Sequence, residues 1–181
     1  MRKSRPKKTT RVLSAAQIAR ILGGFAKRIA DEYGPAASLA FIGIRTRGPT
    51  LARRVADVLK QKHDLPVAVG ELDITLYRDD LNTLLPEGRI DATHIPFEVN
   101  DKTLILFDDV LHTGRTARAA VDHLMALGRP KAIFLAVLVD RGGRELPIEA
   151  WLVGKQVDLR RGGDVRVRLA EVDEVDEVVV A

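Results

Sequence analysis

Two adjacent carboxylates and a hydroxyl-rich turn follow an apolar stretch near the middle of the chain. Asp108 and Asp109 come after the run 103–107, and the sequence Thr-Gly-Arg-Thr at 113–116 opens a segment with apolar residues at helical spacing. Backbone N–H groups at a helix start, together with threonine hydroxyls, can bind a phosphate in the positive end of the helix dipole. Carboxylates can accept hydrogen bonds from neighbouring hydroxyls or hold a hydrated Mg²⁺. The combination indicates a site for a phosphorylated sugar.

A purely structural interpretation of the same segment exists. The aspartates could cap the following helix, and the threonines could only satisfy a turn. An isolated Asp-Asp pair favours that interpretation, whereas the whole run 108–116 behind a strand favours a binding site.

The elements that would position this segment alternate between strand and helix. A capping box at 14–17 and Pro49 each begin a helical pattern, and Gly128 ends the pattern that starts within 113–116. Apolar runs predict strands at 39–44, 67–77, 103–107 and 132–139. We therefore predict an α/β fold with a doubly wound, mainly parallel sheet flanked by helices. Its ligand site would lie at the carboxyl ends of these strands.

Two further segments complete this outline. The polar segment 78–96, with glycine and prolines, is typical of a lid or binding loop. The apolar residues 151–153 and the alternating run 165–169 behind Gly162-Gly163 predict a small antiparallel hairpin at an edge.

For a chain of 181 residues, length and composition favour one soluble domain, which we place at 12–181. The net charge of +4 comes from the basic segment 1–11, for which we predict a flexible tail. No apolar run approaches the ~20 residues of a membrane span, and the tail lacks the apolar centre of a secretory signal. With no cysteine, disulfides and thiolate chemistry are excluded. We expect a cytoplasmic protein.

Four segments occur in an order that resembles the type I phosphoribosyltransferase family. They are GIRTRG at 43–48, ELDITLYRDD at 71–80, DDVLHTGRT at 108–116 and LVDRGGRELP at 138–147. Together they resemble, over about 13–176, the branch of pyrimidine-operon regulators that are also uracil phosphoribosyltransferases, and the second and fourth segments indicate this branch in particular. The resemblance implies the type I phosphoribosyltransferase fold.

The resemblance also implies roles for individual residues. Thr46 and Arg47 would contact pyrophosphate, and so would Arg78 in a mobile catalytic loop; either arginine could instead be an ordinary polar loop residue. Arg47, Arg78, Asp108 and Asp109 are the implied catalytic residues, with the two aspartates on the ribose. The implied sugar-phosphate residues are Val110, Leu111, His112, Thr113, Gly114, Arg115 and Thr116, and the implied base-binding residues are Val139 and Arg141, mostly through main chain.

The implied reaction converts uracil and phosphoribosyl pyrophosphate into UMP and pyrophosphate. Mg²⁺ would be held mainly by the substrate diphosphate, and we assign no metal ligand among the side chains. The implied partners are the leader mRNA of pyrimidine operons, bound in the presence of UMP, and further copies of the chain in a homo-oligomer. The alternatives are an RNA-binding regulator with little catalysis and a purine or orotate phosphoribosyltransferase.

The chain departs from the family pattern near the base. His112 stands where these regulators commonly have tyrosine and where purine-using relatives carry an acid, and Gly143 replaces a common histidine. His112 could act in catalysis or could be an exposed turn residue. Basic residues such as Arg20 and Lys27 are candidates for RNA contact, although dispersed charges more often form solvated faces.

Overall fold

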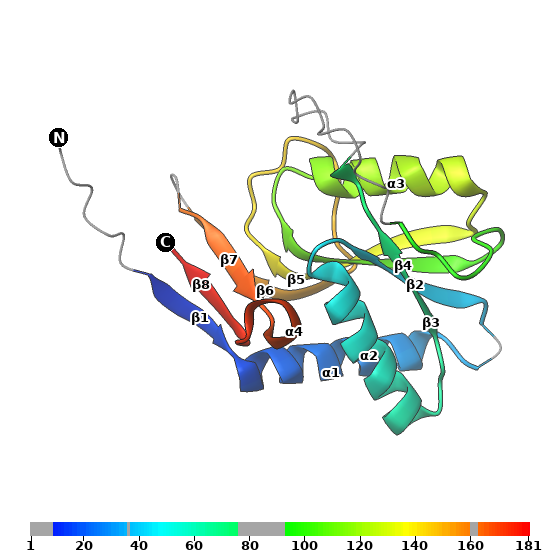
Figure 1. Cartoon of the computed structure of the whole chain (residues 1–181), viewed down its shortest axis with the longest axis horizontal. Coiled ribbons are helices and arrows are strands. Elements are labelled where there is room, and N and C mark those ends of the chain that lie inside the picture. Colours follow the sequence, from blue (N-terminus) through cyan, green and yellow to red (C-terminus); the bar gives the residue numbers. More distant parts are fainter. Residues whose placement is uncertain (1–8, 36, 76–92, 160–162) are drawn as a thin grey trace.

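A five-stranded parallel sheet forms the centre of the molecule (Figure 1). The computed structural model describes residues 9–35, 37–75, 93–159 and 163–181. The strands, in spatial order, are β3 (Ala68–Leu72), β2 (Leu39–Ile44), β4 (Thr103–Leu111), β5 (Ala132–Asp140) and β6 (Leu152–Gln156). Every neighbouring pair in this sheet is parallel. The predicted parallel α/β fold is therefore confirmed.

Helices cover both faces of this sheet, as expected for a doubly wound fold. Helices α1 (Ala15–Glu32) and α2 (Gly48–His63) lie on one face and α3 (Arg115–Leu127) lies on the other (Figure 1). Alternate residues of the central strands divide between the two cores, because side chains along a strand point to opposite faces. Phe107 packs with α1 and α2, whereas Leu106 packs with α3. In the described ranges, no helix is long and apolar enough to cross a membrane.

A separate antiparallel sheet contains both ends of the described chain. Its order is β1 (Thr10–Ser14), β8 (Glu177–Val180) and β7 (Val165–Arg168), and the turn before β8 contains α4 (Ala170–Asp173). The predicted antiparallel element is confirmed, but its strands differ. The prediction that 151–153 belongs to a hairpin was wrong, because β6 pairs with β5 in the parallel sheet. The strand β1 was not predicted, since its pairing partner lies at the other end of the chain.

Two strand boundaries also differ from the prediction. β3 ends at Leu72 because Asp73 accepts a hydrogen bond from the Thr75 backbone N–H at 2.9 Å, which turns the chain away from the sheet. β4 continues past Phe107 to Leu111 through pairing with β5. Asp108 and Asp109 thus belong to the strand itself. The capping box at Ser14 is present, with the Ser14 N–H donating to Gln17 Oε1 at 2.9 Å.

Candidate active site

The turn between β2 and α2 lies tightly against the end of β4. A Cβ atom on Gly48 would lie 2.3 Å from the Phe107 carbonyl oxygen, and one on Gly43 would lie 2.2 Å from the Pro49 nitrogen. Only glycine at these positions allows the backbones to approach so closely. The peptide bond between Arg45 and Thr46 in this turn is cis. The close approach brings Arg47 next to the aspartates of β4.

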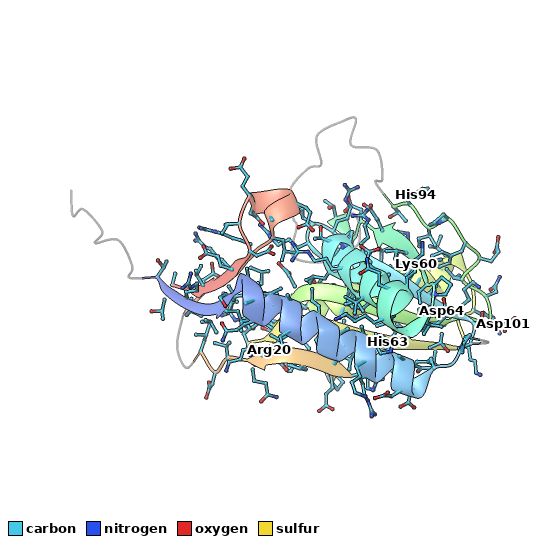
Figure 2. All side chains as sticks on the ribbon, turned by 90° about the horizontal axis from the view of Figure 1, so that it is seen from below. Arg20, Lys60, His63, Asp64, His94 and Asp101 are labelled. Carbon is cyan, nitrogen blue, oxygen red and sulfur yellow. The ribbon has the colours of Figure 1, made fainter. Side chains whose placement is uncertain are left out.

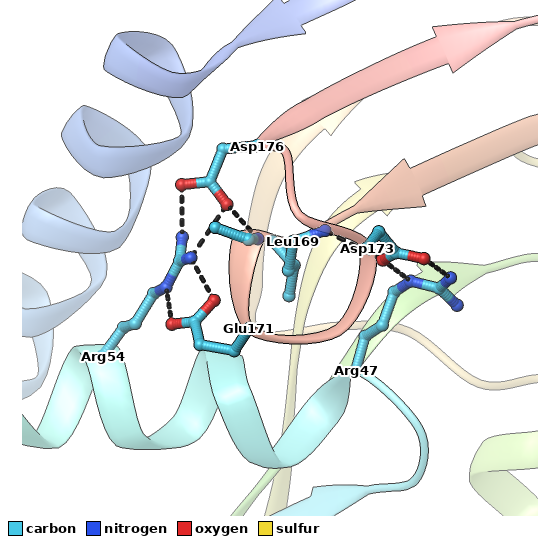
Figure 3. Close-up of polar contacts among 7 residues, drawn as sticks. Arg47, Arg54, Leu169, Glu171, Asp173 and Asp176 are labelled. Carbon is cyan, nitrogen blue, oxygen red and sulfur yellow. Dashed lines mark hydrogen bonds and ion pairs between the residues drawn. The ribbon is translucent and has the colours of Figure 1, made fainter.

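Arg47 contacts carboxylates from two different elements. Its Nε and Nη2 donate hydrogen bonds to Asp173 at 2.9 and 2.7 Å (Figure 3). Its Nη1 lies 3.9 Å from Asp109 Oδ2. The hydrogen bond to Asp173 raises the pKa of Arg47, while the same bond lowers the pKa of Asp173. The guanidinium is therefore a fixed positive charge beside Asp109.

The two adjacent aspartates differ in environment. Asp108 is buried, and one of its carboxylate oxygens accepts a hydrogen bond from the Asp109 backbone N–H at 2.9 Å. Burial raises the pKa of Asp109, although a hydrogen bond with Asp108 and the charge of Arg47 oppose this effect. The Asp109 carboxyl therefore holds its proton more strongly than a solvated aspartate does, and a positive charge or hydroxyl donors from a ligand would favour its ionised form.

A cavity of about 620 Å³ opens in front of these aspartates and the start of α3. Gly114, with φ 90°, has the left-handed backbone that glycine tolerates and forms the N-cap of α3. The Thr113 carbonyl accepts hydrogen bonds from the backbone N–H groups of Glu145 and Leu146 at 3.0 and 3.1 Å, which hold the turn in place. The lining comprises residues 108–117 with Arg141, Glu145, Asp164 and Val165. An anion here would meet the positive end of α3.

A smaller cavity of about 270 Å³ adjoins the first, since His112 and Arg141 line both. Its other lining residues are Asp140, Gly142, Gly143, Gln156, Val157, Asp158 and Leu159. Gly143 has φ 75°, and a Cβ atom there would lie 3.0 Å from His112 Nε2. The glycine therefore makes room for the imidazole. Burial and the charge of Arg141 lower the pKa of His112, which favours the neutral ring at physiological pH.

Arg144 connects the walls of the two cavities. Its guanidinium donates to Asp140 Oδ2 at 2.6 Å and to the carbonyls of His112 and Ile148 at 2.9 Å each. Burial would raise the pKa of Asp140, but hydrogen bonds from Arg144 and the Gly142 N–H lower it overall. Charge-assisted hydrogen bonds thus connect the loop after β5 to the turn at 112–114 that precedes α3.

The structure brings most of the predicted site residues together. The larger cavity is lined by the run 108–116 and by Arg141. Arg47 lies at its edge, next to Asp109. Val139 lines neither cavity and its side chain is fully buried in the core, so its contact with the base through main chain stays a prediction. Arg78 lies outside the described residues. Thr46 lies in the turn beside Arg47.

Two groups of residues around the site were missed from the sequence. Residues 156–159 line the smaller cavity, and Asp173 holds Arg47. A signal for the first group existed, because the apolar residues 151–153, had they been recognised as a fifth parallel strand, would have placed its carboxyl end at the same edge. Asp173 gave no such signal, since its contact joins residues 126 positions apart in the sequence.

The carboxylates of the site could supply only part of the coordination of a metal ion. Within the described ranges, no group of three or more His, Asp or Glu side chains is arranged to hold one. Asp108 and Asp109 offer oxygen atoms of the kind Mg²⁺ prefers, and the remaining ligands would have to come from water and from a bound phosphate compound.

A parallel sheet that carries a phosphate-type turn and paired aspartates at its carboxyl edge is the arrangement of phosphoribosyltransferases. The family described as phosphoribosyl transferase domain matches residues 8–165, and the chain belongs to this family. The fold is similar to hypoxanthine phosphoribosyltransferase of Trypanosoma cruzi, with TM-score 0.72 and 17% identity over 94% of this chain and 95% of that one. An enzyme of the same type from Bacillus anthracis gives TM-score 0.70 and 17% identity, covering 93% and 95%.

Closer relatives belong to one named group within the family. The protein from Chloroflexus aurantiacus named Bifunctional protein PyrR is 48% identical over 169 residues, which cover 93% of each chain. The protein of the same name from Deinococcus radiodurans is 49% identical over 173 residues, 96% of this chain and 93% of the relative. The resemblance inferred from the sequence is confirmed at the level of this group.

Proposed function

We propose that the protein is a uracil phosphoribosyltransferase, which converts uracil and phosphoribosyl pyrophosphate into UMP and pyrophosphate. The observation that carries the proposal is the position of Arg47 Nη1, 3.9 Å from Asp109 Oδ2 at the edge of the larger cavity. A cation for the diphosphate and a carboxylate for the ribose thereby stand side by side. The relatives at 48% identity support the assignment.

The residues would act mainly by binding and positioning. The start of α3, with residues 110–116, would bind the sugar phosphate, and Asp108 and Asp109 would accept hydrogen bonds from the ribose hydroxyls. Thr46, Arg47 and Arg78 would bind the diphosphate. The anomeric carbon gains positive character as the diphosphate leaves, so the fixed charge of Arg47 would stabilise the leaving group and the aspartates would stabilise the sugar.

Mg²⁺ would enter the site with the substrate. When bound, it would neutralise negative charge on the diphosphate. The two adjacent aspartates fit this role as partial ligands or as acceptors from metal-bound water, and neither arrangement requires further side chains.

The base would occupy the smaller cavity. The Arg141 N–H already donates to the Leu111 carbonyl at 3.0 Å, and the Gly142 N–H donates to Asp140 Oδ1 at 2.9 Å. Main-chain carbonyls of this loop would therefore accept the ring N–H of uracil, while residues 156–159 close the other side. His112 lies where the two cavities meet, close to the bond that forms between base and sugar.

A second candidate function is UMP-dependent binding to the leader mRNA of pyrimidine operons, which the resemblance of the sequence motifs to pyrimidine-operon regulators implies; the relatives are named bifunctional, which agrees with a second role. Figure 2 shows Arg20 on α1, and Lys60 and His63 on α2, along the side of the molecule where these helices lie together. Their side chains offer exposed positive or hydrogen-bonding groups. We propose this side as the RNA surface and expect a homo-oligomer in the cytoplasm.

The experiment that tests the enzymatic proposal is an assay of nucleotide formation with a panel of free bases. Uracil, orotate and hypoxanthine are each incubated with phosphoribosyl pyrophosphate and Mg²⁺. The proposal requires UMP from uracil. Product from orotate or hypoxanthine alone would assign the protein to another member of the family.

A further inference from the structure

The turn that contains α4 is attached to the start of α2 by two arginines that bind three of its carboxylates (Figure 3). Arg47 precedes α2 and binds Asp173, whereas Arg54, about two helical turns further along, binds Glu171 and Asp176. Both arginines therefore point from the same side of α2 toward this turn. The contacts connect the small antiparallel sheet to the residue proposed to bind the diphosphate.

Asp173 occupies only one edge of the Arg47 guanidinium. Its two carboxylate oxygens accept from Nε at 2.9 Å and Nη2 at 2.7 Å, which is a bidentate, charge-assisted arrangement. Nη1 instead faces Asp109, and the separation of 3.9 Å makes this contact an ion pair longer than a hydrogen bond. The Nη1 donors are thus directed at the site.

Asp173 is itself held in place. Its Oδ2 accepts a hydrogen bond from the Leu169 backbone N–H at 3.0 Å. The carboxylate therefore does not depend on Arg47 for its own position. The side chains of Arg47 and Asp173 are 28% and 21% exposed, so solvent competes only in part with their contact.

We infer that Asp173 is a positioning residue that aims Nη1 of Arg47 at the diphosphate of phosphoribosyl pyrophosphate. The inference rests on the proposed function and adds to it a residue outside the four family motifs. A free arginine side chain loses rotamer freedom when it binds a ligand, and Asp173 removes that freedom beforehand. Asp173 also partly neutralises the charge of Arg47, which weakens its attraction for a diphosphate. This loss is smaller than the gain from positioning, because the bidentate contact leaves the donors on Nη1 available.

The opposite role for Asp173 would be a latch that competes with the ligand. A latch should occupy the donors that the ligand needs, and it should be free to move away. Asp173 occupies the far edge of the guanidinium and is anchored to the Leu169 backbone. The geometry therefore favours positioning.

The test compares Asp173→Asn with Asp176→Asn in the full-length protein. Asp176 is a matched control, because its Oδ1 accepts from the Ala170 backbone N–H at 2.8 Å and its carboxylate binds Arg54. The two variants thus weaken the same turn, and only the first releases Arg47. Binding of pyrophosphate, phosphoribosyl pyrophosphate and UMP is measured by calorimetry, with KM and kcat measured in parallel.

We expect Asp173→Asn to weaken the binding of pyrophosphate and of phosphoribosyl pyrophosphate by roughly tenfold. The affinity for UMP should stay unchanged, since UMP has no diphosphate. Asp176→Asn should retain all three affinities, and Asp173→Glu should recover part of the loss. Tighter pyrophosphate binding in Asp173→Asn, equal losses in both variants, or an unchanged affinity would overturn the inference. If the wild-type protein bound neither diphosphate compound, the proposed function itself would fail.

Discussion

Arg47 Nη1 and Asp109 Oδ2 lie 3.9 Å apart, although one residue precedes α2 and the other belongs to β4. The contact exists because β2 and β4 are neighbours in the sheet and because Gly48 lets the turn after β2 lie against β4. It places a positive charge beside a carboxylate, as the proposed binding of a leaving diphosphate and of a ribose requires.

Replacement of the paired aspartates should impair catalysis more than folding. We expect Asp108→Asn and Asp109→Asn each to lower kcat/KM for phosphoribosyl pyrophosphate by about 10²-fold, since each loses a charged acceptor for the ribose. Asp122→Asn is the control, because Asp122 only forms an exposed ion pair with Arg118 on α3. Near-normal turnover in both site variants at saturating substrate would reduce the pair to a structural role.

Alanine at Gly143 should disturb the base site through His112. A Cβ at Gly143 would lie 3.0 Å from His112 Nε2, whereas one at Gly142 meets no atom within 4 Å. Both glycines have positive φ, so both alanine variants should lose about 1 kcal/mol of stability. Only Gly143→Ala should also raise KM for uracil. Equal uracil KM values in the two variants would contradict the placement of the base.

The pH dependence of the reaction should report the state of His112. The lowered pKa keeps the ring neutral at pH 7, and protonation follows only as the pH falls below the ordinary histidine value of about 6.5. If the neutral ring takes part in proton transfer, activity should decline on that acidic side, and His112→Phe should remove this decline. An unchanged pH–rate profile in the variant would leave His112 as a wall of the cavity.

Stability should depend on pH through the contact between Asp176 and Arg54. A hydrogen bond from Arg54 lowers the pKa of Asp176, so the ionised carboxylate stabilises the fold. This contribution is complete above the unfolded value of about 3.9 and is lost as the pH falls through the lower folded-state pKa. Asp176→Asn should therefore be about 1 kcal/mol less stable than wild type at pH 7, with the difference shrinking below about pH 4. A constant difference in urea titrations across this range would contradict the assignment.

Regulation requires UMP and RNA to favour the same protein state. Because such coupling is reciprocal, RNA should tighten UMP binding by the same factor by which UMP tightens RNA binding. Arg20→Ala should weaken the binding of cognate leader RNA, and the affinity for any RNA should fall as the salt concentration rises. The measurement is a titration of pyrimidine-leader RNA and a scrambled control at fixed salt, with and without UMP. Equal affinities in all these conditions would remove the regulatory role.

The parts of the site that could be predicted are those formed by residues that are neighbours in the sequence. The run 108–116 combines a buried strand, carboxylates and a glycine turn, and each of these has a local physical cause. The pairing of β1 with β8 and the contact between Arg47 and Asp173 could not be predicted in this way. They depend on which distant segments meet, and apolar periodicity carries no information about that choice.

The most direct test of the central claim is the formation of UMP and pyrophosphate from uracil and phosphoribosyl pyrophosphate by the purified protein. We predict equal amounts of the two products, dependence on Mg²⁺, and a large loss of both in Asp109→Asn. If pyrophosphate is released with orotate or hypoxanthine but not with uracil, the proposed substrate is contradicted. Release of none with any base would contradict the enzymatic role altogether.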